Sequence, residues 1–493
     1  MKLAKVTTSH IQAVTGTTFV STLSSLLFGY CTAVISGVVG AIDYNFIAPR
    51  GMQETAANAL LGLTVCAALG GTILGALCAR RTAELLGRKR PMILASVLFL
   101  VSAFGSAFPE TGFSPIGGLG PDAIWPFIVY RIIGGVAVGL ASVIAPMYVA
   151  EFAPSAVRGQ LGAYQQIAIA GGIAIVLFVN WGIALQGDDI WVLEIGWRYM
   201  MVSLAIPALA FFWLSFTVPE SPSWLVRHGR VEEARRALSR SAEPEEVRAM
   251  LEDLAKDNRA QEKPAPLLAF GARVVFVGVA LSLLQQLMGL NAISYYGPQI
   301  LQRMGFHMDA AFLGVLAARS LNLLATMVVV LVVDRVGRKP LLMSGALIMG
   351  LSMIALGSLF QAENTGALGL VAMCCYMVGL GMSFGPIVWI MMSEIFPAPI
   401  RGQAMSICIA AQWSANFLVS FTFPVMFGDG MLNGFAHGGF AFWLYGAFGL
   451  LAAFLVMRFV PETKGVDSDR LGALWRQQAG LSIAPAARIP TPS

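Results

Sequence analysis

Charged residues are scarce in this chain. Only 12% of its 493 residues are Asp, Glu, Lys or Arg, whereas 57% are hydrophobic. Soluble domains carry about 25% charged residues, so too little charge remains to cover the surface of a soluble enzyme. The high hydrophobicity equally excludes a disordered chain. The composition is that of a polytopic membrane protein.

Cysteine and histidine are also rare, and their positions exclude several kinds of chemistry. The six cysteines lie in or at the ends of apolar segments, without the spacing of a zinc site or a disulfide framework. We expect them to pack as small hydrophobic residues, with Cys31 as the exception considered below. The four histidines have no nucleophile arrangement around them. We therefore expect no enzymatic activity, no cofactor, no metal and no nucleic-acid partner.

The apolar residues fall into twelve runs, each near the roughly 20 residues that cross a bilayer as a helix. Lys and Arg concentrate in the segments 80–90 and 334–340, whereas the segments 110–122 and 188–194 are acidic. Positive charge stays in the cytoplasm, so we expect a multi-pass plasma (inner) membrane protein with both termini cytoplasmic. The runs are 13–40, 59–79, 91–109, 124–150, 158–184, 199–218, 270–297, 311–333, 340–361, 367–393, 401–427 and 438–460.

One strongly polar stretch, 219–266, divides these runs into two sets of six. Its mixture of charged residues with leucine and alanine predicts short surface helices in a cytoplasmic linker. The predicted fold is an all-α membrane protein of twelve transmembrane helices in two six-helix halves. Its parts are an N-terminal bundle at 1–218, the helical linker at 219–266, a C-terminal bundle at 267–460 and a cytoplasmic tail at 461–493.

Three motifs occur once in each half, in the same order and 242 to 250 residues apart. Internal repeats of six spans are typical of secondary transporters, which bind their substrate near the midplane between the halves. The motifs are Glu84-Leu-Leu-Gly-Arg-Lys with Asp334-Arg-Val-Gly-Arg-Lys, Glu151…Arg158-Gly-Gln with Glu394…Arg401-Gly-Gln, and Pro219-Glu-Ser with Pro461-Glu-Thr.

Together these motifs resemble the sugar-porter branch of the major facilitator superfamily. The segments Pro219–Leu225 and Pro461–Gly465 resemble its two end-of-half signatures, and the similarity runs from about residue 25 to 465. The resemblance implies a monomeric transporter of a monosaccharide, a pentose or hexose such as xylose or glucose, that works by alternating access. A sugar sensor that binds without transporting is the alternative from another class, although such sensors have longer cytoplasmic tails.

The charged residues of the repeated motifs are candidates for gating. Arginines and carboxylates at the cytoplasmic ends of helices can pair across the two halves and separate when the halves rock. The resemblance implies that they form a cytoplasmic salt-bridge lock; the alternative is that they only set topology. The candidates are Glu84, Arg88, Glu151, Arg158, Asp334, Arg338, Glu394 and Arg401.

Amide and aromatic side chains inside the spans are candidates for sugar binding. Amides both donate and accept hydrogen bonds, as sugar hydroxyls do, and aromatic faces cover a sugar ring. Gly289 and the Gly385-Pro386 pair are expected to interrupt their helices, as at many transporter sites. The alternative is that the amides only join helices. The resemblance assigns sugar contacts to Phe28, Gln166, Gln285, Gln286, Asn291, Trp389, Gln412 and Trp413, with Tyr295 and Asn416 as weaker candidates.

The first span lacks an acid where proton-coupled members of the branch have an aspartate. The resemblance places Cys31 at that position and Arg131 at the position of its arginine partner. No Asp or Glu occurs between residues 11 and 42, and Asp43 lies twelve residues beyond Cys31, about 18 Å along a helix. We expect proton coupling to be weakened or absent. Protons remain a partner only if another titratable group, or the Cys31 thiol, carries them.

Two further residues depart from the proton-coupled pattern. The resemblance places Ile173 where coupled members have a sugar-contacting glutamine and facilitative members have isoleucine. Arg319 lies about a third of the way into the eighth span. Intramembrane arginines are costly and usually functional, so Arg319 either acts in the interior or extends to the membrane interface.

Overall fold

The structure is a computed structural model that describes residues 8–152, 158–239, 247–248, 250–252, 266–428, 438–464 and 468–478. Within these ranges all regular secondary structure is helical. Twelve segments are long and apolar enough to cross a membrane. The predicted fold class and the predicted number of spans are therefore confirmed.

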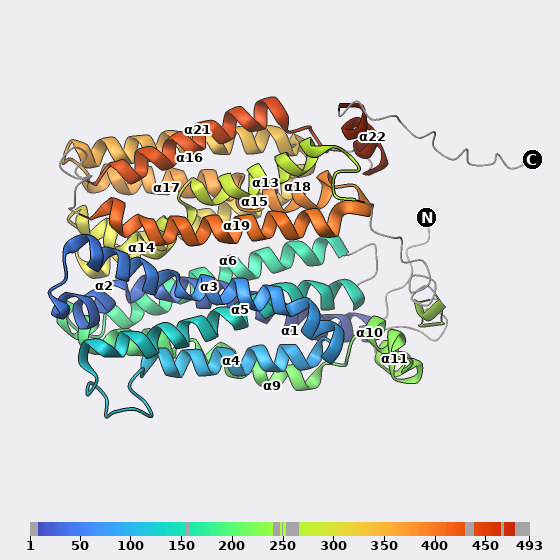
Figure 1. Ribbon diagram of the computed structural model, residues 1–493, viewed down its shortest axis with the longest axis horizontal. Helices are drawn as coiled ribbons and strands as arrows, with labels where there is room; N and C mark the ends of the chain where they lie inside the picture. Colours follow the sequence, from blue (N-terminus) through green and yellow to red (C-terminus); the bar gives the residue numbers. More distant parts are fainter. Residues whose placement is uncertain are drawn as a thin grey trace, which may run out of the picture.

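The first six spans form one bundle, drawn in blue to green in the lower part of Figure 1. The sixth span is split into two helices, and the first ends in a 3-10 turn (Val34–Gly37) followed by the short helix α2 (Val39–Ile42). The long helices are α1 (Thr8–Ala33), α3 (Glu54–Leu86), α4 (Lys89–Ala107), α5 (Ile124–Phe152), α6 (Arg158–Ala184), α8 (Trp197–Val202) and α9 (Ala205–Thr217).

The last six spans form the second bundle, in yellow to red above the first (Figure 1). Two of these spans are interrupted helices, the pairs α13–α14 and α17–α18. The helices are α13 (Ala272–Leu287), α14 (Leu290–Arg303), α15 (Met308–Val336), α16 (Arg338–Gln361), α17 (Gly366–Met382), α18 (Ile387–Ile395), α19 (Ala398–Phe427) and α21 (Phe440–Phe459).

Three short helices lie at one end of the molecule, at the right of Figure 1, which we call the linker end; two are beside the first half and one is beside the second. They are α10 (Pro222–Arg227), α11 (Val231–Leu238) and α22 (Ser468–Gln478). The indole nitrogen of Trp475 on α22 donates to the carbonyl of Ile395 at 3.2 Å. The tail therefore contains a helix docked on the second half, which the sequence analysis did not predict.

The helix α3 is longer than its apolar run. The predicted span ends at residue 79, but the helix continues through Arg80 and Glu84 to Leu86 and ends at Gly87, whose φ is +86°. A helix that leaves the membrane keeps its backbone hydrogen bonds without needing apolar side chains, so hydropathy alone underestimates its length.

At the end opposite the linker the two halves touch closely. A Cβ atom on Gly62 of α3 would lie 2.3 Å from the carbonyl oxygen of Phe421 on α19, a distance that only glycine permits. The 3-10 turn after α1 and the helix α2 also contact α14 there. This end of the space between the halves is therefore closed.

Candidate functional site

A cavity of about 640 Å³ lies between the two halves, within the usual range of roughly 300–1,000 Å³ for small-molecule sites. It reaches toward the linker end, because Ser142 and Pro146 in the last third of α5 and Met405 in the first third of α19 line it. Seven predicted sugar-contacting residues line it: Phe28, Gln285, Gln286, Asn291, Trp389, Gln412 and Trp413. The side chain of Gln166 lies outside the described part of the structure.

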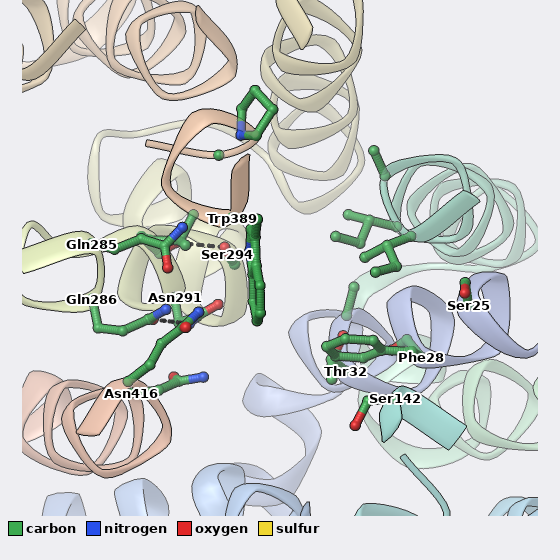
Figure 2. A pocket seen from close by; sticks show the side chains of 18 of the residues that line it. Ser25, Phe28, Thr32, Ser142, Gln285, Gln286, Asn291, Ser294, Trp389 and Asn416 are labelled. Atoms are coloured by element: carbon green, nitrogen blue, oxygen red, sulfur yellow. Dashed lines mark hydrogen bonds between the residues drawn. The ribbon is translucent and has the colours of Figure 1, made fainter. Parts of the chain in front are cut away.

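The two walls of the cavity differ in chemistry. Figure 2 shows the amides of Gln285, Gln286 and Asn291 on the wall formed by the second half, whereas Phe28 and Thr32 face them from the first half. Most of the hydrogen-bonding capacity therefore belongs to the second half. The first half contributes an aromatic ring, hydroxyls, the amide of Gln165 and apolar side chains that include Ile173.

A break at Gly289 brings two of the amides together. Gly289 has a φ of +86° and separates α13 from α14, a conformation that favours glycine. On a regular helix Gln286 and Asn291 would not share a face, yet the Asn291 amide donates to Gln286 Oε1 at 2.6 Å. The hydroxyl of Tyr376 donates to the carbonyl of Met288 at 3.0 Å, which satisfies a backbone group at the break.

The interruption in the tenth span positions a third amide. The helix α17 ends at Met382 and α18 begins at Ile387, so the expected break at Gly385-Pro386 is present. The Gln285 amide nitrogen donates to the carbonyl of Phe384 inside this break. Gln285 Oε1 and Gln412 Oε1 are buried without a hydrogen-bond partner among the described residues. Both oxygens are thus available to accept a hydrogen bond from a ligand hydroxyl.

Aromatic side chains join the halves across the cavity. The ring of Phe28 on α1 lies 6.0 Å from that of Trp413 on α19, centroid to centroid, at an angle of 42°. The indole of Trp389 on α18 lies on the wall with the amides (Figure 2). The rings supply apolar faces beside the amides, which is the combination that a sugar ring requires.

Cys31 and Arg131 contact each other inside the first half, behind the cavity wall. Cys31 is fully buried and Arg131 is 1% exposed. Arg131 Nη2 donates to the backbone carbonyl of Cys31 at 3.3 Å, and its Nε has no partner within the described residues. No carboxylate of the described chain pairs with Arg131.

At the linker end the first half contains a compact ion-pair network. Arg88 Nη2 pairs with Glu151 at 2.6 Å, and the Ser221 hydroxyl donates to the same carboxylate. Glu220 accepts hydrogen bonds from the backbone N–H groups of Arg88, at 2.7 Å, and Lys89, at 3.3 Å. The network joins the ends of α3, α5 and α9.

The second half repeats this network residue for residue. Arg338 pairs with Glu394 at 3.0 Å, and the Thr463 hydroxyl donates to Glu394 at 2.5 Å. Glu462 accepts from the backbone N–H groups of Arg338 and Lys339, both at 3.0 Å. Burial raises the pKa of Glu462, but backbone N–H donors headed by that of Arg338 outweigh it and hold the pKa below its usual range.

The roles of Glu220, Ser221, Glu462 and Thr463 were missed by the sequence analysis. The signal was present, because both copies of the Pro-Glu-Ser/Thr motif belong to the same repeat as the Gly-Arg-Lys segments. The motifs were used to establish the repeat, and their polar side chains were not considered as partners of the arginines.

In this arrangement of the molecule the described pairs of gating candidates do not cross the two halves, so the predicted salt-bridge lock stays a prediction. Each described pair among the gating candidates joins residues of one half, including Arg338 with Asp334 at 2.9 Å. Glu84 pairs with Arg80 at 2.9 Å on the exposed surface of α3, outside the network. Arg401 Nε donates to the carbonyl of Phe396 at 3.1 Å, and the side chain of Arg158 lies outside the described residues.

Arg319 lies in the interior. It is 6% exposed, it lines the cavity, and its guanidinium donates to the hydroxyl of Ser294. The alternative that it extends to the membrane interface is therefore wrong.

Comparisons with known proteins agree with this geometry. The family model "Sugar (and other) transporter" matches residues 17–475. The D-xylose-proton symporter of Escherichia coli is 42% identical, over 94% of this chain and 95% of its own. The glucose facilitated diffusion protein of Zymomonas mobilis is 38% identical, over 94% of this chain and 98% of its own.

Among solved structures, the inward open conformation of the xylose transporter XylE from E. coli has a TM-score of 0.84 at 40% identity, covering 94% of this chain and all of that one. The same transporter bound to 6-bromo-6-deoxy-D-glucose gives 0.77 at 42% identity, covering 94% and 99%. The similarity is thus higher to the inward open form than to the form bound to the sugar analogue. These relatives are transporters and not enzymes, and this chain belongs to the sugar transporter family of the major facilitator superfamily.

Proposed function

We propose that this protein carries a pentose or hexose, of the kind of xylose or glucose, across the plasma (inner) membrane by alternating access. The cavity with seven amide and aromatic side chains at predicted sugar-contacting positions carries the proposal. The names of the relatives, one a xylose symporter and the other a glucose facilitator, support the substrate class. They give no support to a sensor.

In the proposed binding mode the second half holds the sugar and the first half closes over it. Gln285, Gln286 and Gln412 make hydrogen bonds to the hydroxyls, while Trp389 and Phe28 cover the ring. Gln166 is included on the resemblance alone. One chain contains both walls of the cavity, so a monomer is sufficient for binding and transport.

Each half moves as one body in this mechanism. The two linker-end networks, centred on Arg88 and Arg338, fasten the helices within their own half and so keep it rigid. Closure of the linker end brings the two networks together, and the contact of Gly62 with Phe421 separates. The moving bodies are residues 1–218 and 267–460, joined by the linker 219–266 and followed by the tail 461–493. We place the linker end and both termini in the cytoplasm, as the positive charges indicate.

Proton coupling is weakened or absent in our proposal. The names of the relatives do not decide this point, because a proton symporter and a facilitator match this chain over similar lengths. The residues support the proposal, because Arg131 faces the carbonyl of Cys31 and has no described carboxylate partner. Cys31 is fully buried, and burial in apolar surroundings disfavours the charged thiolate, so we expect the thiol to keep its proton when the halves rock.

Uptake into proteoliposomes tests the proposal. Vesicles loaded with unlabelled xylose or glucose should accumulate radiolabelled sugar transiently by counterflow, with the same time course with and without a pH gradient. Vesicles without protein serve as the control. Absence of counterflow for both sugars, and for D-glucuronate in the same vesicles, would overturn the transport proposal, and accumulation that requires the gradient would overturn only the statement on coupling.

A further inference from the structure

The cavity wall contains a single charged side chain among the described residues, the guanidinium of Arg319 on α15. Asn322 and Thr326 lie three and seven positions further along the same helix, and both also line the cavity. Positions i, i+3 and i+7 share one face of a helix. Arg319 is thus part of the stripe that α15 presents to the ligand.

Arg319 has no anionic partner in the described chain. Its guanidinium donates to the Ser294 hydroxyl, and its other polar neighbours are the phenols of Tyr376 and Tyr295. An arginine does not lose its proton in a protein, and a buried cation is costly unless an anion pairs with it. The cavity lining supplies no Asp or Glu within the described residues. An anion that enters with the ligand would supply the missing charge.

The position of Arg319 relative to the amides fits one bound molecule. Ser294, which accepts from Arg319, lies one helical turn after Asn291 on α14, and Asn291 is hydrogen-bonded to Gln286. Residues three apart on a helix are separated by about 5–6 Å between Cβ atoms. A sugar ring held by Gln286 and Asn291 therefore brings a substituent on its edge within reach of Arg319.

We infer that the transported monosaccharide carries a carboxylate, as a hexuronate does, and that Arg319 binds this group. The planar guanidinium matches a carboxylate with two parallel hydrogen bonds, while the amides and aromatic rings bind the rest of the sugar. A neutral sugar leaves the cation without a partner. The inference rests on the proposed function and narrows its substrate class.

Calorimetric titration of the purified full-length protein tests the inference without any mutation. The ligands are D-glucuronate, its neutral methyl ester, D-glucose and D-xylose, in a methanesulfonate buffer. D-glucuronate should bind at least about 10-fold more tightly than the ester, because a hydrogen bond to a charged group exceeds one to a neutral group. Equal or weaker binding of the acid would overturn the inference.

A second arm replaces methanesulfonate by chloride. Suppose that chloride tightens the binding of the neutral sugars, and that the protein binds D-glucuronate no more tightly than the methyl ester. A free chloride ion then pairs with Arg319, and the inference is wrong. If the neutral sugars bind and D-glucuronate does not, the inference falls and the proposed function stands. If none of the four sugars binds, the proposed function itself falls.

Substitutions of Arg319 test whether its guanidinium is the group that causes the preference for D-glucuronate. Arg319→Gln should weaken D-glucuronate binding about 10- to 100-fold and weaken ester binding much less, and Arg319→Lys should keep part of the preference. Arg235→Gln, on the exposed surface of α11, is the matched control and should change neither. Equal loss for acid and ester in a folded Arg319→Gln would contradict a specific role of the guanidinium. The wild-type comparison decides the question if the variant does not fold.

Discussion

Replacing Gln286 by alanine should weaken sugar binding strongly while the protein remains folded. The side chain is 4% exposed and lies on the cavity wall, where its Oε1 accepts from the Asn291 amide at 2.6 Å. The substitution removes the amide that faces the sugar and also leaves the Asn291 N–H group without its partner. Both effects act at the same place, on the ligand side of the break at Gly289.

The size of the effect follows from these two losses. A buried polar group left without a hydrogen bond costs about 1–3 kcal/mol, and 1.4 kcal/mol corresponds to a tenfold change in Kd. We therefore expect Kd for the sugar to rise by about 5- to 150-fold in Gln286→Ala. The fold should tolerate the change because the cavity reaches the linker end, so water can hydrogen-bond to Asn291.

The assay is calorimetric titration with a monosaccharide that binds the wild type, after size-exclusion chromatography to confirm a monodisperse protein. Gln186→Ala is the matched control, since Gln186 is an exposed glutamine whose side chain donates to the carbonyl of Gly182. The double variant with Asn291→Ala should cost less than the sum of the single changes, because the two side chains share one hydrogen bond. A Kd within twofold of the wild type in a folded Gln286→Ala would refute the site assignment.

Three further predictions concern the aromatic wall, the gate and the linker-end network. Trp389→Ala should abolish detectable sugar binding in the same titration without unfolding the protein, and unchanged affinity would contradict the role of the indole. Arg158→Cys and Arg401→Cys should each slow net transport in proteoliposomes while leaving Kd within a few fold; a collapse of affinity at an unchanged rate would contradict a gating role. The pKa of Glu462 is lowered in the folded protein, so its contribution to stability is present above its ordinary pKa, near 4.3, and is lost as the pH falls through the lowered value. The Tm of the wild type, measured at a series of pH values, should therefore fall at acid pH, and the Tm of Glu462→Gln should fall less. Identical dependence of Tm on pH in both proteins would contradict a stabilising role of the Glu462 carboxylate.

The spans and the amide wall were predictable from the sequence because both depend on residue type. A run of apolar residues has few alternatives to a membrane helix, and an amide inside such a run needs a polar partner. The breaks at Gly289 and Gly385-Pro386 were also visible, since these residues interrupt a helix. The effect of these breaks on the site was not predictable from the sequence. Gln286 and Asn291 meet only because Gly289 takes a left-handed conformation, which spacing along a regular helix does not reveal.

Other features depended on the tertiary arrangement. The sequence analysis left open whether Arg319 acts in the interior or extends to the membrane interface, although Asn322 and Thr326 mark the same helix face as polar. The partners of Arg88 and Arg338 come from segments 63 and 56 residues away, and the repeat indicated which residues correspond without showing which of them touch. Which charged residues pair also depends on the conformation of the molecule. With the linker ends of the two halves apart, Arg88 and Arg338 pair only with carboxylates of their own half among the described residues.

The central claim, that the exchange of an acid for Cys31 uncouples the carrier from protons, is tested most directly by the sugar accumulation ratio. Wild type and Cys31→Asp are compared in proteoliposomes under an inward gradient of one pH unit, which is worth about 1.4 kcal/mol, or tenfold accumulation for each coupled proton. We predict a ratio near one for the wild type. In Cys31→Asp, where a carboxylate again faces Arg131, the ratio should approach ten. Gradient-driven accumulation by the wild type would contradict the account.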